Sequence, residues 1–335
     1  MHARTIVLTA ALALPAFLAS RLLPAQEIGA PVLGTGKQRF EWVHDWATLP
    51  EGVSFGNTHG CIVSDSSGRV YVNTDTKRAV MVFEADGRLV DSWGEDLAGG
   101  LHGMCVVEED GGEFLYLTHT ARHIAAKATL GGEIPWTLGY PEASGLYDSA
   151  DSYRPTSIAV APDGGIFVAD GYGKSWIHQY DAEREYLRSF AGPGPEPGRT
   201  RTPHGISIDL RGEEPLLVVS DRENHRLQWF DLSGELVRTL AEELRRPCHT
   251  DFFGEELLVA DLAGRVSLFD GKGELLAHLG DNPDASLRAT NGAPRERWTD
   301  GEFLAPHCAH FDARGDIYVM DWNALGRITK LRRVD

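Results

Sequence analysis

The stretch that decides the fold is PHGISIDLRGEEPLLVVSDRENHRLQWFDLSGELVRTL, residues 203–240. It opens with a short strand at Pro203-His204-Gly205, continues through the apolar strand 217–221, and closes with a strand that ends at Leu240. Turns rich in Gly, Asp and Ser separate these segments. Short β-rich runs divided by turns of this kind predict a four-stranded antiparallel unit.

The same unit recurs along the chain. Similar copies span residues 58–94, 101–139, 155–190, 247–280 and 306–331. Repeats of roughly 40 to 60 residues with four short strands are typical of β-propeller blades, and six such blades close one ring. The sequence therefore predicts an all-β, six-bladed propeller.

The last copy runs out of chain before its fourth strand. Residues 40–46 (FEWVHDW) have the fourth-strand pattern, although no blade precedes them. We expect this N-terminal strand to complete the sixth blade and to remove the open sheet edges. Residues 38–335 are thus predicted to form a single propeller domain.

Composition and charge restrict the partners. The 335 residues are 42% hydrophobic and 24% charged, with a formal net charge of −17. An acidic chain without a basic patch is a poor ligand for nucleic acid or for anionic membranes. We expect a monomer that binds a small carboxylate-bearing substrate or a peptide.

The N-terminus has the pattern of a targeting segment. Residues 1–25 contain a basic start, an apolar run and a small-residue end, which is typical of a secretory signal peptide, and residues 26–37 form a linker. An uncleaved anchor is the alternative, and no later segment is long and apolar enough to span a bilayer. The folded part is expected to be secreted or periplasmic.

The four cysteines are compatible with two states. Disulfides persist in an oxidising compartment, whereas small buried thiols on inner strands are an equally good interpretation. The sequence does not choose a pairing. The four are Cys61, Cys105, Cys248 and Cys308.

Polar side chains recur at one mouth of the predicted channel. The start of each first strand and the end of each second strand meet there. The starts carry His59, His102, Thr156, His204, Cys248 and His307, and the ends carry Asp75, His119, Asp170, Asp221, Asp261 and Asp321. Converging imidazoles are good ligands for zinc. Alternatively, each histidine bonds the backbone of its turn, and most of the aspartates accept backbone N–H groups.

Several phrases are similar to those of a known family. Residues 203–207 (PHGIS), 168–175 (VADGYGKS) and 219–228 (VSDRENHRLQ) resemble NHL-repeat propellers, and more narrowly the peptidyl-α-hydroxyglycine α-amidating lyases. The similarity extends over nearly all of residues 38–334. It implies a zinc ion on the channel axis, held by histidines of alternate blades that match His102, His204 and His307.

The resemblance also implies a reaction. The lyases cleave the N–C bond of a carbinolamide, which releases glyoxylate and leaves a peptide amide. The matching residues are Tyr172, expected as the base, and Arg222, expected to bind the substrate carboxylate. A further catalytic arginine of the family lies in the first blade, where this chain has Lys77 and Arg78. That role either passes to Arg78 or is lost.

Some positions depart from the family. Cys308 replaces a carboxylate that binds calcium in the lyases, so the calcium site is incompletely matched. His59 and His249 are additional candidate metal ligands, which would favour a closed structural site. Two function classes remain: a zinc-dependent lyase, and a non-catalytic propeller that binds a protein, peptide or glycan on its loop face. A sugar lactonase would require a carboxylate-rich calcium centre instead of histidines.

Overall fold

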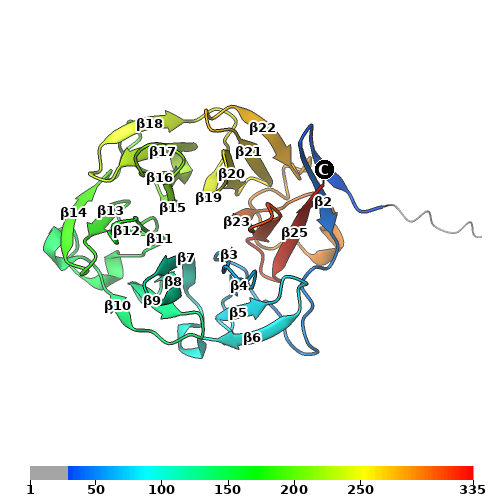
Figure 1. Ribbon diagram of the computed structural model, residues 1–335, viewed down its shortest axis with the longest axis horizontal. Helices are drawn as coiled ribbons and strands as arrows, with labels where there is room; N and C mark the ends of the chain where they lie inside the picture. Colours follow the sequence, from blue (N-terminus) through cyan, green and yellow to red (C-terminus); the bar gives the residue numbers. More distant parts are fainter. Residues whose placement is uncertain (1–28, 335) are drawn as a thin grey trace, which may run out of the picture.

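The computed structural model describes residues 29–334. The expected signal peptide lies outside the described residues, as do linker residues 26–28. Six antiparallel sheets stand around a central axis like the blades of a propeller (Figure 1). Strands β3, β7, β11, β15, β19 and β23 are innermost and surround this axis. The predicted six-bladed propeller is confirmed.

The blades follow one another in chain order. Blade one consists of β3 (Ile62–Ser64), β4 (Val70–Asn73), β5 (Val80–Phe83) and β6 (Leu89–Trp93), and blade two of β7 (Leu101–Glu109), β8 (Gly112–His119), β9 (Ile124–Thr129) and β10 (Trp136–Leu138). Blade three consists of β11 (Ser157–Val160), β12 (Ile166–Ala169), β13 (Ile177–Tyr180) and β14 (Tyr186–Phe190), and blade four of β15 (Pro203–Asp209), β16 (Leu216–Asp221), β17 (Arg226–Asp231) and β18 (Leu236–Leu240). Blade five consists of β19 (Pro247–Phe253), β20 (Glu256–Asp261), β21 (Arg265–Phe269) and β22 (Leu275–Leu279).

The sixth blade joins the two ends of the chain. Its order is β1 (Val32–Thr35), β2 (Gln38–Val43), β25 (Arg327–Arg333), β24 (Ile317–Asp321) and β23 (Pro306–Phe311). Trp42 of β2 pairs with Leu331 of β25, so the N-terminal strand closes the ring as predicted. The strand is 38–43 and not the expected 40–46. Trp46 lies beyond it, with its ring centroid 4.9 Å from that of Tyr318.

The hydrophobic core lies between the blades. The middle strands are buried on both faces, as in β4, β5 and β20, because each blade is packed between two neighbours. Short runs of Val, Leu and Phe suit such strands, since both alternating side-chain sets face apolar surroundings.

Buried aspartates at the ends of the second strands fix the segments that enter the first strands. The carboxylate of Asp221 accepts the backbone N–H of Arg201 at 2.6 Å, and that of Asp321 accepts the N–H of Ala305 at 2.7 Å. Asp170 and Asp261 make equivalent bonds. These carboxylates therefore act as backbone acceptors, and those of Asp221 and Asp321 fix the segments that lead to His204 and His307.

Helical structure in residues 29–334 is limited to single 3-10 turns at Glu95–Leu97, Glu142–Ser144, Ala150–Ser152, Arg222–Asn224 and Arg295–Arg297. No helix in that part of the chain is long and apolar enough to cross a membrane. The four cysteines are unpaired thiols, three of them buried.

Candidate active site and metal centre

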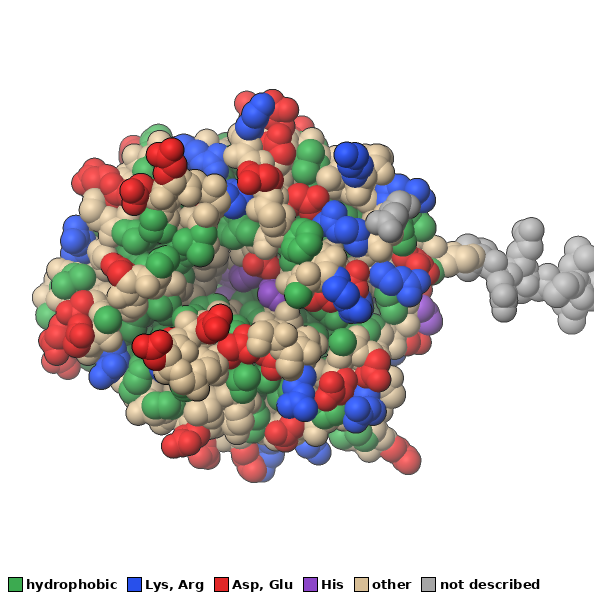
Figure 2. Space-filling model, in the orientation of Figure 1, with side chains coloured by type: hydrophobic (Ala, Val, Ile, Leu, Met, Phe, Trp, Pro, Cys, Tyr) green, Lys and Arg blue, Asp and Glu red, His purple; other side chains and the backbone are tan. Residues whose placement is uncertain are grey.

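Three histidines from alternate blades meet on the channel axis. His102, His204 and His307 are each the second residue of an innermost strand, β7, β15 and β23. Each is 2% exposed. Their ring centroids are 4.8, 4.8 and 4.6 Å apart, which is a nearly equilateral triangle. The structure thus brings together the three histidines selected from the sequence, and Figure 2 shows histidine side chains within the central hollow.

Each of the three rings is held in the same way. The Nδ1 atoms of His102, His204 and His307 lie 2.7, 3.0 and 2.8 Å from a backbone carbonyl oxygen of the next blade. Nδ1 must therefore carry the proton, and Nε2 presents its lone pair to the axis. This is the carbonyl-anchored arrangement that is usual for metal-binding histidines.

The chemistry of these atoms fits a zinc ion. Burial lowers the pKa of all three imidazoles, which keeps them neutral near pH 7. Among residues 29–334, the Nε2 of His307 is buried and has no hydrogen-bond partner, which is costly for a polar atom unless it binds a ligand. Three neutral imidazoles with convergent Nε2 atoms are a known zinc donor set.

Glycine after the histidine allows the close approach of neighbouring inner strands. A Cβ atom on Gly103 would lie 2.6 Å from the carbonyl oxygen of Thr156, and one on Gly205 would lie 2.3 Å from that of Cys248. These are the carbonyl oxygens that accept the Nδ1–H groups of His102 and His204. The His-Gly pairs in the sequence therefore have a packing reason.

Tyr172 and Arg222 cover the histidines at the mouth. The Tyr172 hydroxyl lies 2.9 Å from His204 Nε2 and 3.2 Å from His102 Nε2. Arg222 Nη1 is 3.3 Å from the same hydroxyl. The loops after β12 and β16 position these two side chains. Asp170 accepts the backbone N–H of Lys174 at 2.6 Å in the first loop, and Asp221 accepts the side-chain N–H of Asn224 at 2.8 Å in the second.

Burial and the neighbouring Arg222 shift the pKa of Tyr172 in opposite directions. Burial raises the pKa of the Tyr172 phenol, while the Arg222 guanidinium opposes part of that rise. Tyr172 is thus a phenol near pH 7 in the metal-free protein. Glu223 lies 2.9 Å from Arg222 Nε and 2.5 Å from Arg246 Nη2, so it fixes both cations. Arg246 was not selected from the sequence, where nothing distinguishes it from other surface arginines.

His59 lies on the mouth side of the same cluster. Its ring centroid is 5.1 Å from that of His102 and 4.9 Å from that of His307, and its Nε2 is 3.4 Å from the Tyr172 hydroxyl. One ligand atom from each of His59, His102 and His307 lies within 4.8 Å of the others. His59 is therefore close enough to be an alternative third ligand. Within residues 29–334 no hydrogen bond anchors its Nδ1, and for this reason we favour His204 as the third ligand.

Two sequence candidates lie elsewhere. Arg78 is exposed, and its Nη1 atom bonds Ser92 Oγ at 2.9 Å on the outer strand β6. The structure does not bring Arg78 to the histidines, because it lies in the turn between β4 and β5, beyond the end of the second strand. His249 faces Cys61 and Cys308, in a second cluster further along the axis.

The sequence comparisons find relatives among the amidating lyases. A probable peptidyl-α-hydroxyglycine α-amidating lyase of Caenorhabditis elegans is 30% identical over 169 residues, which is 49% of this chain and 46% of the relative. Peptidyl-α-hydroxyglycine α-amidating lyase 1 of Drosophila melanogaster is 31% identical over 264 residues, 72% of this chain and 46% of the relative. This chain resembles the amidating lyases. It spans less than half the length of these curated relatives, and no family model matches it.

Solved structures support the fold alone. A gluconolactonase of Xanthomonas campestris is 15% identical with a TM-score of 0.60, over 91% of this chain and 98% of that structure. A streptogramin B lyase is 16% identical with a TM-score of 0.57, over 88% of this chain and 97% of that structure. Propellers of this kind carry different chemistries, so the site decides the function.

Proposed function

We propose that this chain is a secreted or periplasmic zinc-dependent lyase that converts a peptidyl-α-hydroxyglycine to a peptide amide and glyoxylate. The observation that carries the proposal is the convergence of three anchored imidazoles with a phenol and a guanidinium at one mouth of the channel. His102, His204 and His307 would hold the zinc ion through their Nε2 atoms. When bound, the ion supplies Lewis acidity towards the substrate hydroxyl and positive charge that favours the ionised phenol.

The chain's own residues have distinct tasks. Arg222 binds the substrate carboxylate, because its planar guanidinium matches that group with two parallel hydrogen bonds. Tyr172 Oη takes the proton of the α-hydroxyl. The N–C bond then breaks, its electron pair and one proton go to the amide nitrogen, and the former hydroxyl carbon becomes the aldehyde of glyoxylate. Atoms and charge balance without a redox partner.

The test is glyoxylate release from an N-acyl-α-hydroxyglycine. Tyr172→Phe should lower kcat by about 10²- to 10⁴-fold, which is the usual contribution of a general base. Arg222→Lys should raise KM, since loss of a charge-assisted bidentate contact costs about 1.5–3 kcal/mol. Arg188→Gln is the matched control, because Arg188 is exposed on the outer strand β14, where its Nη1 bonds the Ser233 carbonyl at 2.9 Å.

Metal content gives the second readout. His204→Ala should lose the axial zinc, whereas His59→Ala should retain it. A wild-type protein that carries zinc yet releases no glyoxylate would refute the lyase and favour the binding propeller. Wild-type protein without stoichiometric metal would refute the zinc centre itself.

A further inference from the structure

Two cysteines and a histidine form a second buried cluster on the channel axis. One ligand atom from each of Cys61, His249 and Cys308 lies within 4.8 Å of the others. Cys308 is fully buried, and Cys61 is 6% exposed. The three come from blades one, five and six, so 247 positions of sequence separate the two thiols and only ring closure brings them together.

The His249 ring is anchored as the axial histidines are. Its Nδ1 lies 3.1 Å from the carbonyl oxygen of Ala309 in the next blade. The proton therefore sits on Nδ1, and Nε2 is left as a donor atom for a metal ion. The same device that prepares His102, His204 and His307 is thus repeated one layer along the channel.

Cys308 is also oriented by hydrogen bonds with the backbone. Cys308 Sγ lies 3.4 Å from the Ile62 amide nitrogen and 3.6 Å from the Ile62 carbonyl oxygen. The N–H group contacts the sulfur directly, and such outer contacts fix the direction of a metal-binding sulfur. Metal binding would replace the weak S–H contact to the carbonyl.

We propose that Cys61, His249 and Cys308 bind a second, thiophilic metal ion, with zinc as the expected occupant. Two thiolates and one imidazole form a soft donor set that suits Zn²⁺ and does not suit calcium, which prefers oxygen ligands. With Zn–S bonds of about 2.3 Å, tetrahedral geometry places two sulfur ligands about 3.8 Å apart. The ligand atoms lie within 4.8 Å of one another, so the two sulfur atoms need to approach by at most about 1 Å to reach this separation.

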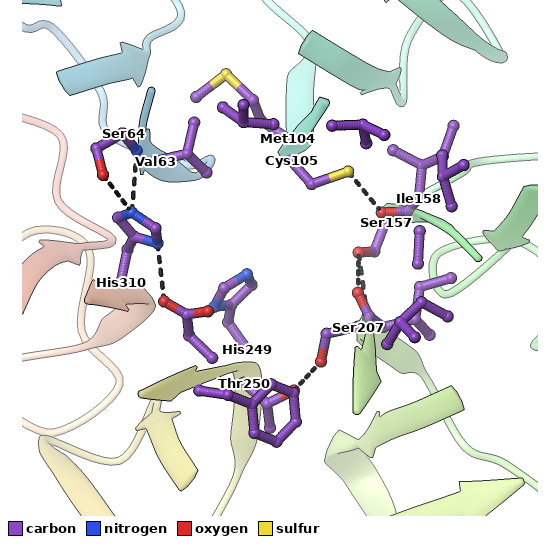
Figure 3. A pocket seen from close by; sticks show the side chains of 18 of the residues that line it. Val63, Ser64, Met104, Cys105, Ser157, Ile158, Ser207, His249, Thr250 and His310 are labelled. Carbon is purple, nitrogen blue, oxygen red and sulfur yellow. Dashed lines mark hydrogen bonds and ion pairs between the residues drawn. The ribbon is translucent and has the colours of Figure 1, made fainter. Parts of the chain in front are cut away.

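One member of this cluster, His249, lines a pocket at the opposite mouth of the channel. This pocket of about 440 Å³ is lined by the later residues of the innermost strands and by His249 (Figure 3). In the lining of this pocket, His310 Nδ1 lies 2.8 Å from Asp251 Oδ2, and His310 Nε2 lies 2.8 Å from Ser64 Oγ. These groups are already paired, so they leave the cluster of Cys61, His249 and Cys308 as the available metal donors. Three protein ligands leave one tetrahedral position for water from the pocket.

Cobalt substitution tests the proposal without any assay of activity. The full chain, purified under reducing and anaerobic conditions, is loaded with Co²⁺ and its near-ultraviolet spectrum is recorded. Sulfur-to-cobalt charge transfer requires a thiolate ligand, and the axial histidine site offers none. We expect this band in the wild type and in His204→Ala, a weaker band in Cys61→Ser or Cys308→Ser, and its loss when both cysteines are replaced by serine.

The controls keep the experiment decisive. Cys105→Ser should keep the band, because Cys105 bonds the Ile158 carbonyl and does not belong to the cluster. His249→Gln removes a ligand with less disturbance of the core, and should lose one equivalent of bound zinc if the serine variants fail to fold. Absence of the band in reduced wild type, or its persistence when both cysteines are replaced by serine, would overturn the proposal. A Cys61–Cys308 disulfide found by peptide mapping of native protein would also overturn it.

Discussion

The most informative perturbation is acidification of a protein in which His178 is replaced by glutamine. His178 is fully buried on β13, with Nε2 2.7 Å from the Tyr147 hydroxyl and Nδ1 2.7 Å from Ser189 Oγ. Tyr147 in turn donates to Asp170 at 2.6 Å, and Asp170 fixes the loop that carries Tyr172. This network therefore connects the core of blade three to the candidate site.

The sign and size of the effect follow from proton linkage. Burial lowers the pKa of His178 from 6.5 to about 3. The unfolded chain therefore takes up a proton as pH falls below 6.5, whereas the folded chain does so only near pH 3. Stability that is present above pH 6.5 is lost across this window. Between pH 7.5 and pH 4.5 the loss from this one group is about 2.7 kcal/mol.

Urea unfolding of wild type and His178→Gln at several pH values measures this contribution. Chelator is present throughout, so that metal release does not add to the pH dependence. The axial histidines are common to both proteins, and their protonation cancels in the difference between the two free energies of unfolding. That difference should move by about 2.7 kcal/mol in favour of the variant from pH 7.5 to pH 4.5. A difference independent of pH would refute a buried neutral His178.

Three further predictions concern ring closure and the metal centre. Trp42→Ala should lower the free energy of unfolding by about 3–5 kcal/mol, because Trp42 is 3% exposed in the closing strand. The control Val90→Ala, on an exposed edge, should cost less than about 0.5 kcal/mol. Equal urea midpoints for the two variants would contradict closure of the ring by this strand. Gly205→Ala should weaken zinc binding about 10- to 100-fold, because the added Cβ meets the carbonyl that anchors His204. Competition with a chromophoric chelator measures this, and the control Gly139→Ala, at a position with open space, should leave zinc binding unchanged. Unchanged zinc affinity in Gly205→Ala would show that this anchor is unimportant. Protein at a free zinc concentration of 100 times Kd should have a free energy of unfolding about 2.7 kcal/mol higher than the same protein after chelation of the zinc. A Tm that does not change with zinc would argue against a site specific to the folded state.

Much of the architecture could be predicted because the repeat is local. Each blade is one supersecondary unit with its own turns, so the number of copies gives the number of blades, and the same position in each copy reaches the same place on the axis. This is why His102, His204 and His307 could be selected together. Arg78 could not be placed in this way, because its neighbours Lys77 and Thr76 lie in a turn that the repeat does not fix.

The sequence by itself determined the propeller, the unmatched fourth strand and the histidines at alternate blade starts, because these follow from periodicity and turn chemistry. Only the tertiary structure decided which nitrogen of each ring faces the axis, because that depends on a carbonyl oxygen supplied by the next blade. Tertiary structure also brought Cys61 to Cys308 and placed Tyr172 between two imidazoles and a guanidinium. Such contacts join residues far apart in the chain, and their distances are set by closure of the ring and not by any local pattern.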